Sequence, residues 1–201
     1  LIGGDRSSKE TIDGNRDIFL KNGLTYMEQT APSYIPVENA LPEILGSLNL
    51  SETDLLEHHL PVIVNTGNSF LIVPVANTKI LQAIKPDLDR IARYSEKMGL
   101  IGYYVFSPSD EASIAATARM FGPYYGIVEE AATGMAAGPL ASYLYDYHLT
   151  QNTQLTIKQG EFMPTPSPSL IHVELVTENG KINRLYAGGD AFVSTEKSVT
   201  I

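Results

Sequence analysis

Hydrophobic residues along the chain gather in short, β-rich runs that are separated by glycine, proline or polar turns. Two such runs, in DIFLKNGLTYMEQTAP, flank Asn22-Gly23, a dipeptide typical of a two-residue β-hairpin. A second pair, in LPVIVNTGNSFLIVPV, meets at Thr66, Gly67 and Asn68, where polar residues and glycine indicate a sharp turn. The pattern therefore predicts two pairs of strands in the first half of the chain.

Helical periodicity follows each strand pair. The segment 38–58 predicts a helix that breaks at 46–49 and then a short helical turn, in which Ser51 and Asp54 resemble a capping box. The segment 78–99 predicts a helix interrupted before Pro86. After that interruption, a single helical face carries residues spaced at i, i+3, i+4 and i+7: Leu88, Ile91, Ala92 and Ser95.

The second half of the chain alternates in the same way. LIGYYVFSPS predicts a strand, and a helix from Gly134 to about His148 is apolar on more than one face, which predicts that it is enclosed. TQLTIKQG, SLIHVELVT and KINRLYAGGDAFVST predict three closing strands. Their connections are too short for parallel crossovers, so we expect antiparallel pairing and an α+β fold.

The start of the helix at Gly134 combines acidic and small residues. Glu129 and Glu130 come just before Thr133, and glycine or alanine then recurs through the first turn and a half, around Met135. The acids can simply complement the helix dipole, with Thr133 as the N-cap. Alternatively, the small residues let an anion reach the free N–H groups at the helix start. Local physics leaves both interpretations open.

The composition of the chain excludes several classes of partner and of catalytic chemistry. The 201 residues carry a formal charge of -9, which argues against nucleic acid or anionic membranes as main partners. No apolar run reaches the roughly 18 residues of a membrane span, and we expect a cytoplasmic protein. The chain has no cysteine, and its four histidines show no metal-ligand spacing, so we expect neither a metal nor thiol chemistry.

The stretch RMFGPYYGIVEEAATGMAAGPLASYL resembles the signature of the phenazine-biosynthesis-like (PhzF) family, approximately Arg-x-Phe-x-Pro-x-x-Gly-Ile-x-Glu-Asp-Pro-x-Thr-Gly. The matching positions are Arg119, Phe121, Pro123, Gly126, Ile127, Glu129, Thr133 and Gly134. YMEQTAPSY, LPVIVNTGNSFLIVPV, IKQGEF and YAGGDAFV resemble other stretches of the family in the same order. The resemblance runs from about Asp17 to the end of the chain.

This resemblance implies a diaminopimelate-epimerase-like fold, in which mostly antiparallel, barrel-like sheets wrap around central helices. It implies a cofactor-free isomerase that moves a proton on a small carboxylic acid at a site between two domains, and a homodimer. Carried over to this chain, Glu130 is the acid of the site. The substrate's carboxylate is then bound at Thr133, Gly134, Met135 and Ala136, with Thr66, Gly67 and Asn68 opposite.

Two positions depart from the family pattern. Glu130-Ala131 stands in place of Asp-Pro, and Met135 stands where a small polar residue is common. The family's presumed base, a Glu in a Ser-Glu-Thr motif of the first domain, has no match before residue 17. The segment SETD at 51–54, which contains Glu52, has the residue types of that motif. Its position in the second domain instead indicates that Glu52 is a solvated acid in a first helical turn.

We therefore expect residues 1–16 to be a remnant of, or link from, an N-terminal domain, and residues 17–201 to be the C-terminal domain. Two functions remain open at this point. One is an isomerase of which this chain supplies one side of the active site. The other is a truncated or degenerate domain that binds a small anion or a partner without catalysis.

Overall fold

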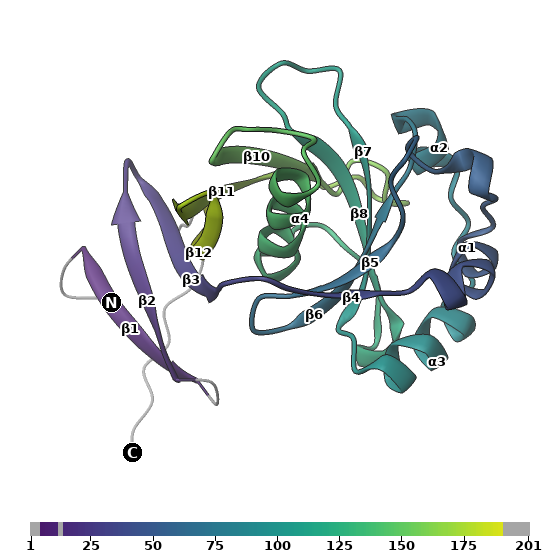
Figure 1. Ribbon diagram of the computed structural model, residues 1–201, viewed down its shortest axis with the longest axis horizontal. Helices are drawn as coiled ribbons and strands as arrows, with labels where there is room; N and C mark the ends of the chain where they lie inside the picture. The colour runs from purple at the N-terminus through teal and green to yellow at the C-terminus, as the bar shows by residue number, and fades with distance from the viewer. Residues whose placement is uncertain (1–4, 12–13, 191–201) are drawn as a thin grey trace.

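A twelve-stranded sheet curls around one helix in the computed structural model, which describes residues 5–11 and 14–190 (Figure 1). Its order is β1-β2-β3-β12-β11-β10-β8-β7-β6-β5-β4, with β9 paired to β8. The pairs are antiparallel except β6 with β7 and β8 with β10. The strands are β1 Arg6–Thr11, β2 Gly14–Lys21, β3 Leu24–Thr30, β4 Ser33–Pro36, β5 Val62–Asn65, β6 Ser69–Pro74, β7 Gly102–Pro108, β8 Ala116–Gly122, β9 Ile127–Glu130, β10 Gln154–Gln159, β11 Ser169–Glu178 and β12 Lys181–Gly189.

Helices lie on both faces of this sheet. The enclosed one is α4, Gly134–Asp146, and the outer face of the central strands carries α1, α2 and α3 (Figure 1). The remaining helical elements are α1 Leu41–Leu48, α2 Thr78–Ala83, α3 Leu88–Met98, and the short 3-10 turns η1 Glu38–Ala40, η2 Glu52–Asp54 and η3 Pro123–Tyr125. The protein thus has three layers around its central strands.

Two hydrophobic cores follow from strand alternation. Tyr104 and Phe106 of β7 face α4, whereas Tyr103 and Val105 of the same strand face the outer helices. Because successive side chains of a strand point to opposite faces, a strand covered on both sides is apolar throughout. This explains the apolar runs of β5, β6 and β7, and it places the inner core around α4.

The predicted elements are largely confirmed. The turn at Asn22-Gly23 has both residues at positive φ, as a two-residue hairpin requires, and β10, β11 and β12 are antiparallel. The polar opening was expected to form no element, but it includes β1, whose backbone pairs with β2. The break at 46–49 was placed too early, since α1 continues through Gly46 and ends at Leu48 with Asn49 in the left-handed region.

Small residues in α4 are required by its enclosure. Ala136, Ala137 and Gly138 are buried, and a Cβ added at Gly138 would lie 2.1 Å from Gln29 Oε1 and 2.5 Å from Leu185 Cδ1. The helix therefore approaches β3 and β12 more closely than a side chain would allow. The small residues at the start of α4 were also consistent with an anion site. Close packing of the helix is sufficient to explain those that are buried.

We predict that Gly138→Ala lowers the free energy of unfolding by about 1–3 kcal/mol, because overpacking outweighs the roughly 1 kcal/mol that alanine gains in a helix. Urea denaturation measures this change. Gly46→Ala in α1 is the matched control, since its added Cβ meets only the end of the Arg90 side chain. That variant should be neutral or stabilised, and equal losses in both variants would contradict the packing argument.

Candidate active site at the start of helix α4

The N-terminus of α4 is the exposed end of an otherwise buried helix. β9 ends at Glu130, a short connection leads to the buried Thr133, and Gly134 and Met135 are exposed. Ala136, the fourth of the residues expected to bind the anion here, is fully buried. At this end of the helix, only Gly134 and Met135 are therefore exposed.

Gln159 at the end of β10 holds this corner together. Its Nε2 donates to the carbonyl oxygen of Glu130 at 2.7 Å and to Thr133 Oγ1 at 3.0 Å. Its Oε1 accepts from the Thr133 N–H at 3.1 Å and from the Tyr104 hydroxyl at 2.8 Å. One fully buried amide thus uses all its hydrogen-bonding capacity to fix the connection between β9 and α4.

The Glu130 carboxylate lies within this network. Its Oε2 accepts a hydrogen bond from Thr133 Oγ1 at 2.8 Å. Thr133 occupies the N-cap position, but its side chain makes no capping hydrogen bond, so the expectation that it caps α4 is wrong. Burial, and then the nearby Glu130 charge, raise the pKa of the Tyr104 hydroxyl, which keeps that phenol neutral and donating.

The number of free donors at the helix start is smaller than expected. The carbonyl oxygen of Thr133 accepts the N–H groups of Ala136 and Ala137, each at 3.0 Å. An anion at the helix start needs free N–H groups in the first turn, residues 134–137. Of these four residues, only Gly134 and Met135 have N–H groups without an acceptor among residues 5–11 and 14–190.

Glu129 has a different role from its neighbour. It forms a two-pronged ion pair with Arg119, whose Nε and Nη2 lie 2.8 and 2.9 Å from the carboxylate oxygens. Arg119 Nη1 also donates to the carbonyl oxygens of Leu81 and Ile84, each at 3.1 Å, at the end of α2. The interpretation of Glu129 as a complement to the α4 dipole is therefore wrong.

The turn expected opposite the helix start lies beside the start of α4. Thr66 Oγ1 donates to Gln29 Oε1 at 2.7 Å, and Gln29 Nε2 donates to the carbonyl oxygen of Gly134 at 2.9 Å. Gly67 has a φ of 114° and uses its N–H on Asn65 Oδ1, so it serves the turn itself. Asn68 Nδ2 makes a long contact of 3.5 Å with Met135 Sδ.

Two hollows open beside the helix start. One of about 120 Å³, here called the cationic hollow, is lined among others by Gly67, Asn68, Met135, Lys9 and Arg16. A second, open hollow of about 590 Å³ lies beside Gly134 and includes the end of β12. Neither lining contains Glu130. Of the eight residues expected at the site, five line these hollows, namely Thr66, Gly67, Asn68, Gly134 and Met135, whereas Glu130, Thr133 and Ala136 line neither.

Other candidates stay apart from this corner. Glu52 is exposed in η2, beside a capping box in which the Ser51 N–H and hydroxyl both contact the Asp54 carboxylate, as the sequence predicted. No group of three acidic or histidine side chains within residues 5–11 and 14–190 is placed to hold a metal ion. Across the same residues, no helix is long and apolar enough to cross a membrane.

Sequence analysis missed Gln29 and Gln159. Both are long amides at buried positions of strands, where a hydrogen-bonding role is expected because an unpaired amide is costly to bury. The sequence signal for such a role was a glutamine inside a predicted strand that resembles the family: Gln29 in YMEQTAP and Gln159 in IKQG.

Solved structures share this architecture. A PhzF-family protein from Bacillus anthracis superposes with a TM-score of 0.78 at 23% identity, covering 100% of this chain and 70% of its own. One from Enterococcus faecalis has a TM-score of 0.66 at 20% identity, covering 97% and 65%. The sheet, the enclosed helix and these superpositions define an α+β protein of the diaminopimelate-epimerase-like fold.

Residues 20–197 match the model of the phenazine biosynthesis-like protein family (PhzC-PhzF), and the chain belongs to this family. An uncharacterized isomerase of Clostridium acetobutylicum is 33% identical over 75% of this chain and 51% of its own length. The trans-2,3-dihydro-3-hydroxyanthranilate isomerase of Pseudomonas chlororaphis is 29% identical over 70% and 47%. The chain spans about half the length of the curated relatives it matches.

Proposed function

We propose that this chain forms one side of the active site of an isomerase that moves a proton on a small carboxylic acid without a cofactor. We assign residues 17–201 to its C-terminal domain, and β1 and β2 extend the sheet of that domain. Names of relatives support the reaction class, since several are called isomerases. The homodimer stays a prediction from the family resemblance, and the cytoplasmic location stays a prediction from the sequence pattern.

The observation that carries this proposal is the exposed pair of N–H groups at Gly134 and Met135, on the end of a helix whose flanks are fixed by Gln159 and Gln29. Unpaired N–H groups and the positive end of the helix dipole bind a carboxylate. Such a site holds the substrate in a fixed position, and proton transfer requires the substrate to be held close to the acid or base. Glu130 supplies the proton-transfer group, because a carboxylate can act as acid or base once it reaches the substrate.

The placement of Glu130 also favours a second candidate function. Its carboxylate bonds to Thr133 and lies outside both hollows, while Met135, with 41% of its surface exposed, stands where a polar donor would aid binding. A domain that binds a small anion without proton transfer has these properties. Catalysis by Glu130 requires its side chain to leave Thr133 and turn toward the bound acid.

The two functions share an anion site and differ in chemistry. We expect sulfate or acetate, titrated into labelled protein, to shift the amide resonances of Gly134 and Met135 more than those of Ala136 and Ala137, whose N–H groups are already bonded. Nuclear magnetic resonance spectroscopy measures the shifts. No response at Gly134 and Met135 would remove the anion site, and with it both functions.

Proton transfer is tested separately in heavy water, with the full-length protein that carries both sides of the site. Incorporation of solvent deuterium into a carboxylic acid identifies the isomerase, and trans-2,3-dihydro-3-hydroxyanthranilate, the compound in the name of several relatives, is the first acid to test. Anion binding without deuterium incorporation into any acid tested would favour the non-catalytic domain.

A further inference from the structure

Two cations face each other across the β1–β2 ribbon. Lys9 and Arg16 are direct partners in the antiparallel register, so their side chains leave the sheet on the same face. Like charges placed directly opposite destabilise a strand pair. Within residues 5–11 and 14–190, neither side chain forms an ion pair.

Acidic residues of the same strands point the other way. Ile18 pairs with Met27, so alternation puts Arg16 of β2 and Gln29 of β3 on one face. The acids of β1, β2 and β3 alternate onto the opposite face, namely Glu10, Asp17 and Glu28. Glu28, which also borders the cationic hollow, directs its carboxylate to the Asp17 N–H at 3.1 Å and to Arg184 at 3.9 Å.

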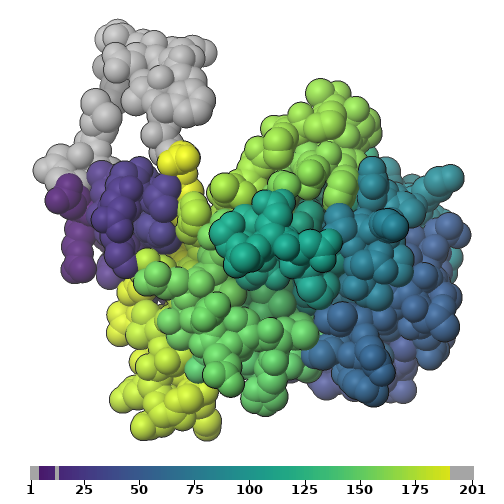
Figure 2. All heavy atoms as spheres, turned by 90° about the horizontal axis from the view of Figure 1, so that it is seen from above, coloured from purple at the N-terminus to yellow at the C-terminus, as the bar shows by residue number. Residues whose placement is uncertain are grey.

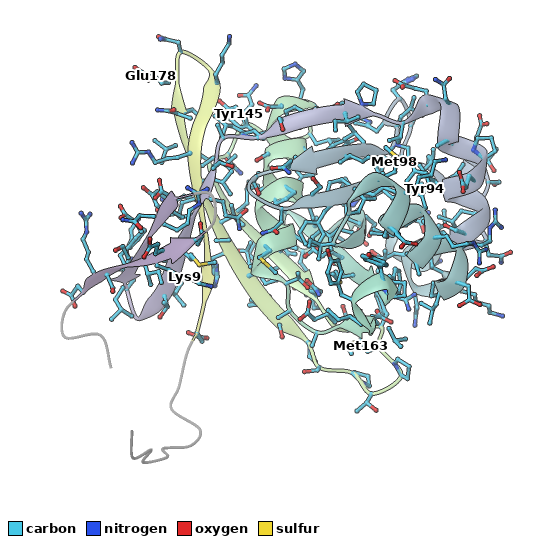
Figure 3. The ribbon with its side chains drawn as sticks, turned by 90° about the horizontal axis from the view of Figure 1, so that it is seen from below. Lys9, Tyr94, Met98, Tyr145, Met163 and Glu178 are labelled. Atoms are coloured by element: carbon cyan, nitrogen blue, oxygen red, sulfur yellow. The ribbon has the colours of Figure 1, made fainter. Side chains whose placement is uncertain are left out.

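The cationic face is the one turned toward the start of α4. Lys9 and Arg16 line the same hollow as Met135 and Asn68, and Gln29 on that face bonds to Gly134. Figure 2 shows the purple N-terminal strands at one end of the molecule, away from the blue helical segment. In Figure 3, Lys9 lies at the end of the molecule opposite Tyr94 and Met98 of α3.

We propose that Lys9 and Arg16 form a second anion subsite in the cationic hollow, so that the ligand of this corner is a small organic acid with two anionic groups. One carboxylate binds the N–H groups of Gly134 and Met135, which rests on the proposed function, and the second binds between the two cations. The acids of β1, β2 and β3 lie on the opposite face and do not neutralise Lys9 and Arg16. A bound anion between the two cations would therefore offset their repulsion. The hollow of about 120 Å³ limits the ligand to a few carbon atoms between its charged ends.

A matched pair of acids tests this subsite on the whole chain. Succinate and butyrate have the same number of carbon atoms, and only succinate has a second carboxylate. We expect succinate to bind about tenfold more tightly than butyrate at low ionic strength, because each added charge-assisted contact at a partly exposed site contributes modestly and is screened by salt. Amide shifts of Gly134 and Met135 give both dissociation constants.

Charge-matched variants separate the subsite from general electrostatics. Lys9→Gln with Arg16→Gln should make succinate bind no better than butyrate, with butyrate affinity within about twofold of the parent. Lys85→Gln with Arg93→Gln removes two exposed cations elsewhere and should keep the preference for succinate. Equal affinities in the parent, or an equal loss in the control, would overturn the subsite alone. No shift at Gly134 and Met135 with either acid would overturn the proposed function as well.

Discussion

Glu130→Gln is expected to cut turnover of the full-length enzyme by about 10²- to 10⁴-fold, the usual range for a general acid–base residue. The substitution keeps the size of the side chain and an oxygen that accepts the Thr133 hydroxyl, but it removes the group that exchanges a proton. Because that hydrogen bond survives, folding stability should change little. Loss of turnover with normal stability therefore isolates the chemical role.

Solvent deuterium incorporation into the substrate, compared between the parent and Glu130→Gln, measures this effect. Glu52→Gln is the control, since Glu52 is an exposed acid in η2 and should leave incorporation unchanged. If Glu130→Gln incorporates deuterium as fast as the parent, Glu130 does not take part in proton transfer. Its contribution is then the hydrogen bond to Thr133.

Arg119→Met is expected to lower the free energy of unfolding by about 3–5 kcal/mol, because it leaves the Glu129 carboxylate buried without its partner. Both side chains are nearly inaccessible, at 7% and 6% exposure. The change also removes the donors that bind the carbonyl oxygens of Leu81 and Ile84. Chemical denaturation by urea measures the loss.

A double variant distinguishes a stranded charge from lost packing. Arg119→Met with Glu129→Leu removes both charges and should recover much of the loss, since apolar replacement of a buried pair is often tolerated. Lys158→Met breaks the exposed pairs with Glu111 and Glu161 and should cost less than about 1 kcal/mol. A double variant as unstable as the single one would show that the charge is not the cause.

Elements with local signals were predictable from the sequence. The hairpin at Asn22-Gly23, the interruption before Pro86 and the enclosed helix at Gly134 each follow from turn chemistry or apolar periodicity, and each is observed. β1 has no such signal, because its six residues are mostly exposed and polar. Its pairing depends on backbone hydrogen bonds with β2, which composition does not reveal.

The roles of the two adjacent acids were not predictable from a helix-based interpretation. Glu129 and Glu130 are successive residues of β9, and side chains of successive strand residues point to opposite faces. The first therefore reaches Arg119, and the second reaches Thr133. An interpretation that places both acids at the start of a helix hides this alternation. Recognising a four-residue strand there would have separated the two carboxylates.

The pairing of β3 with β12 has a consequence for synthesis of the protein. The register joins residues 25–30 to residues 184–189, so β3 has no partner on this side until residues 184–189 have left the ribosome. Until then, α4 lacks the wall that Leu185 provides, and an unpaired strand edge lies beside an apolar helix. Contacts so distant in sequence form slowly, and the incomplete chain is prone to aggregate. Nascent chains of this protein should therefore engage chaperones until β12 closes the sheet.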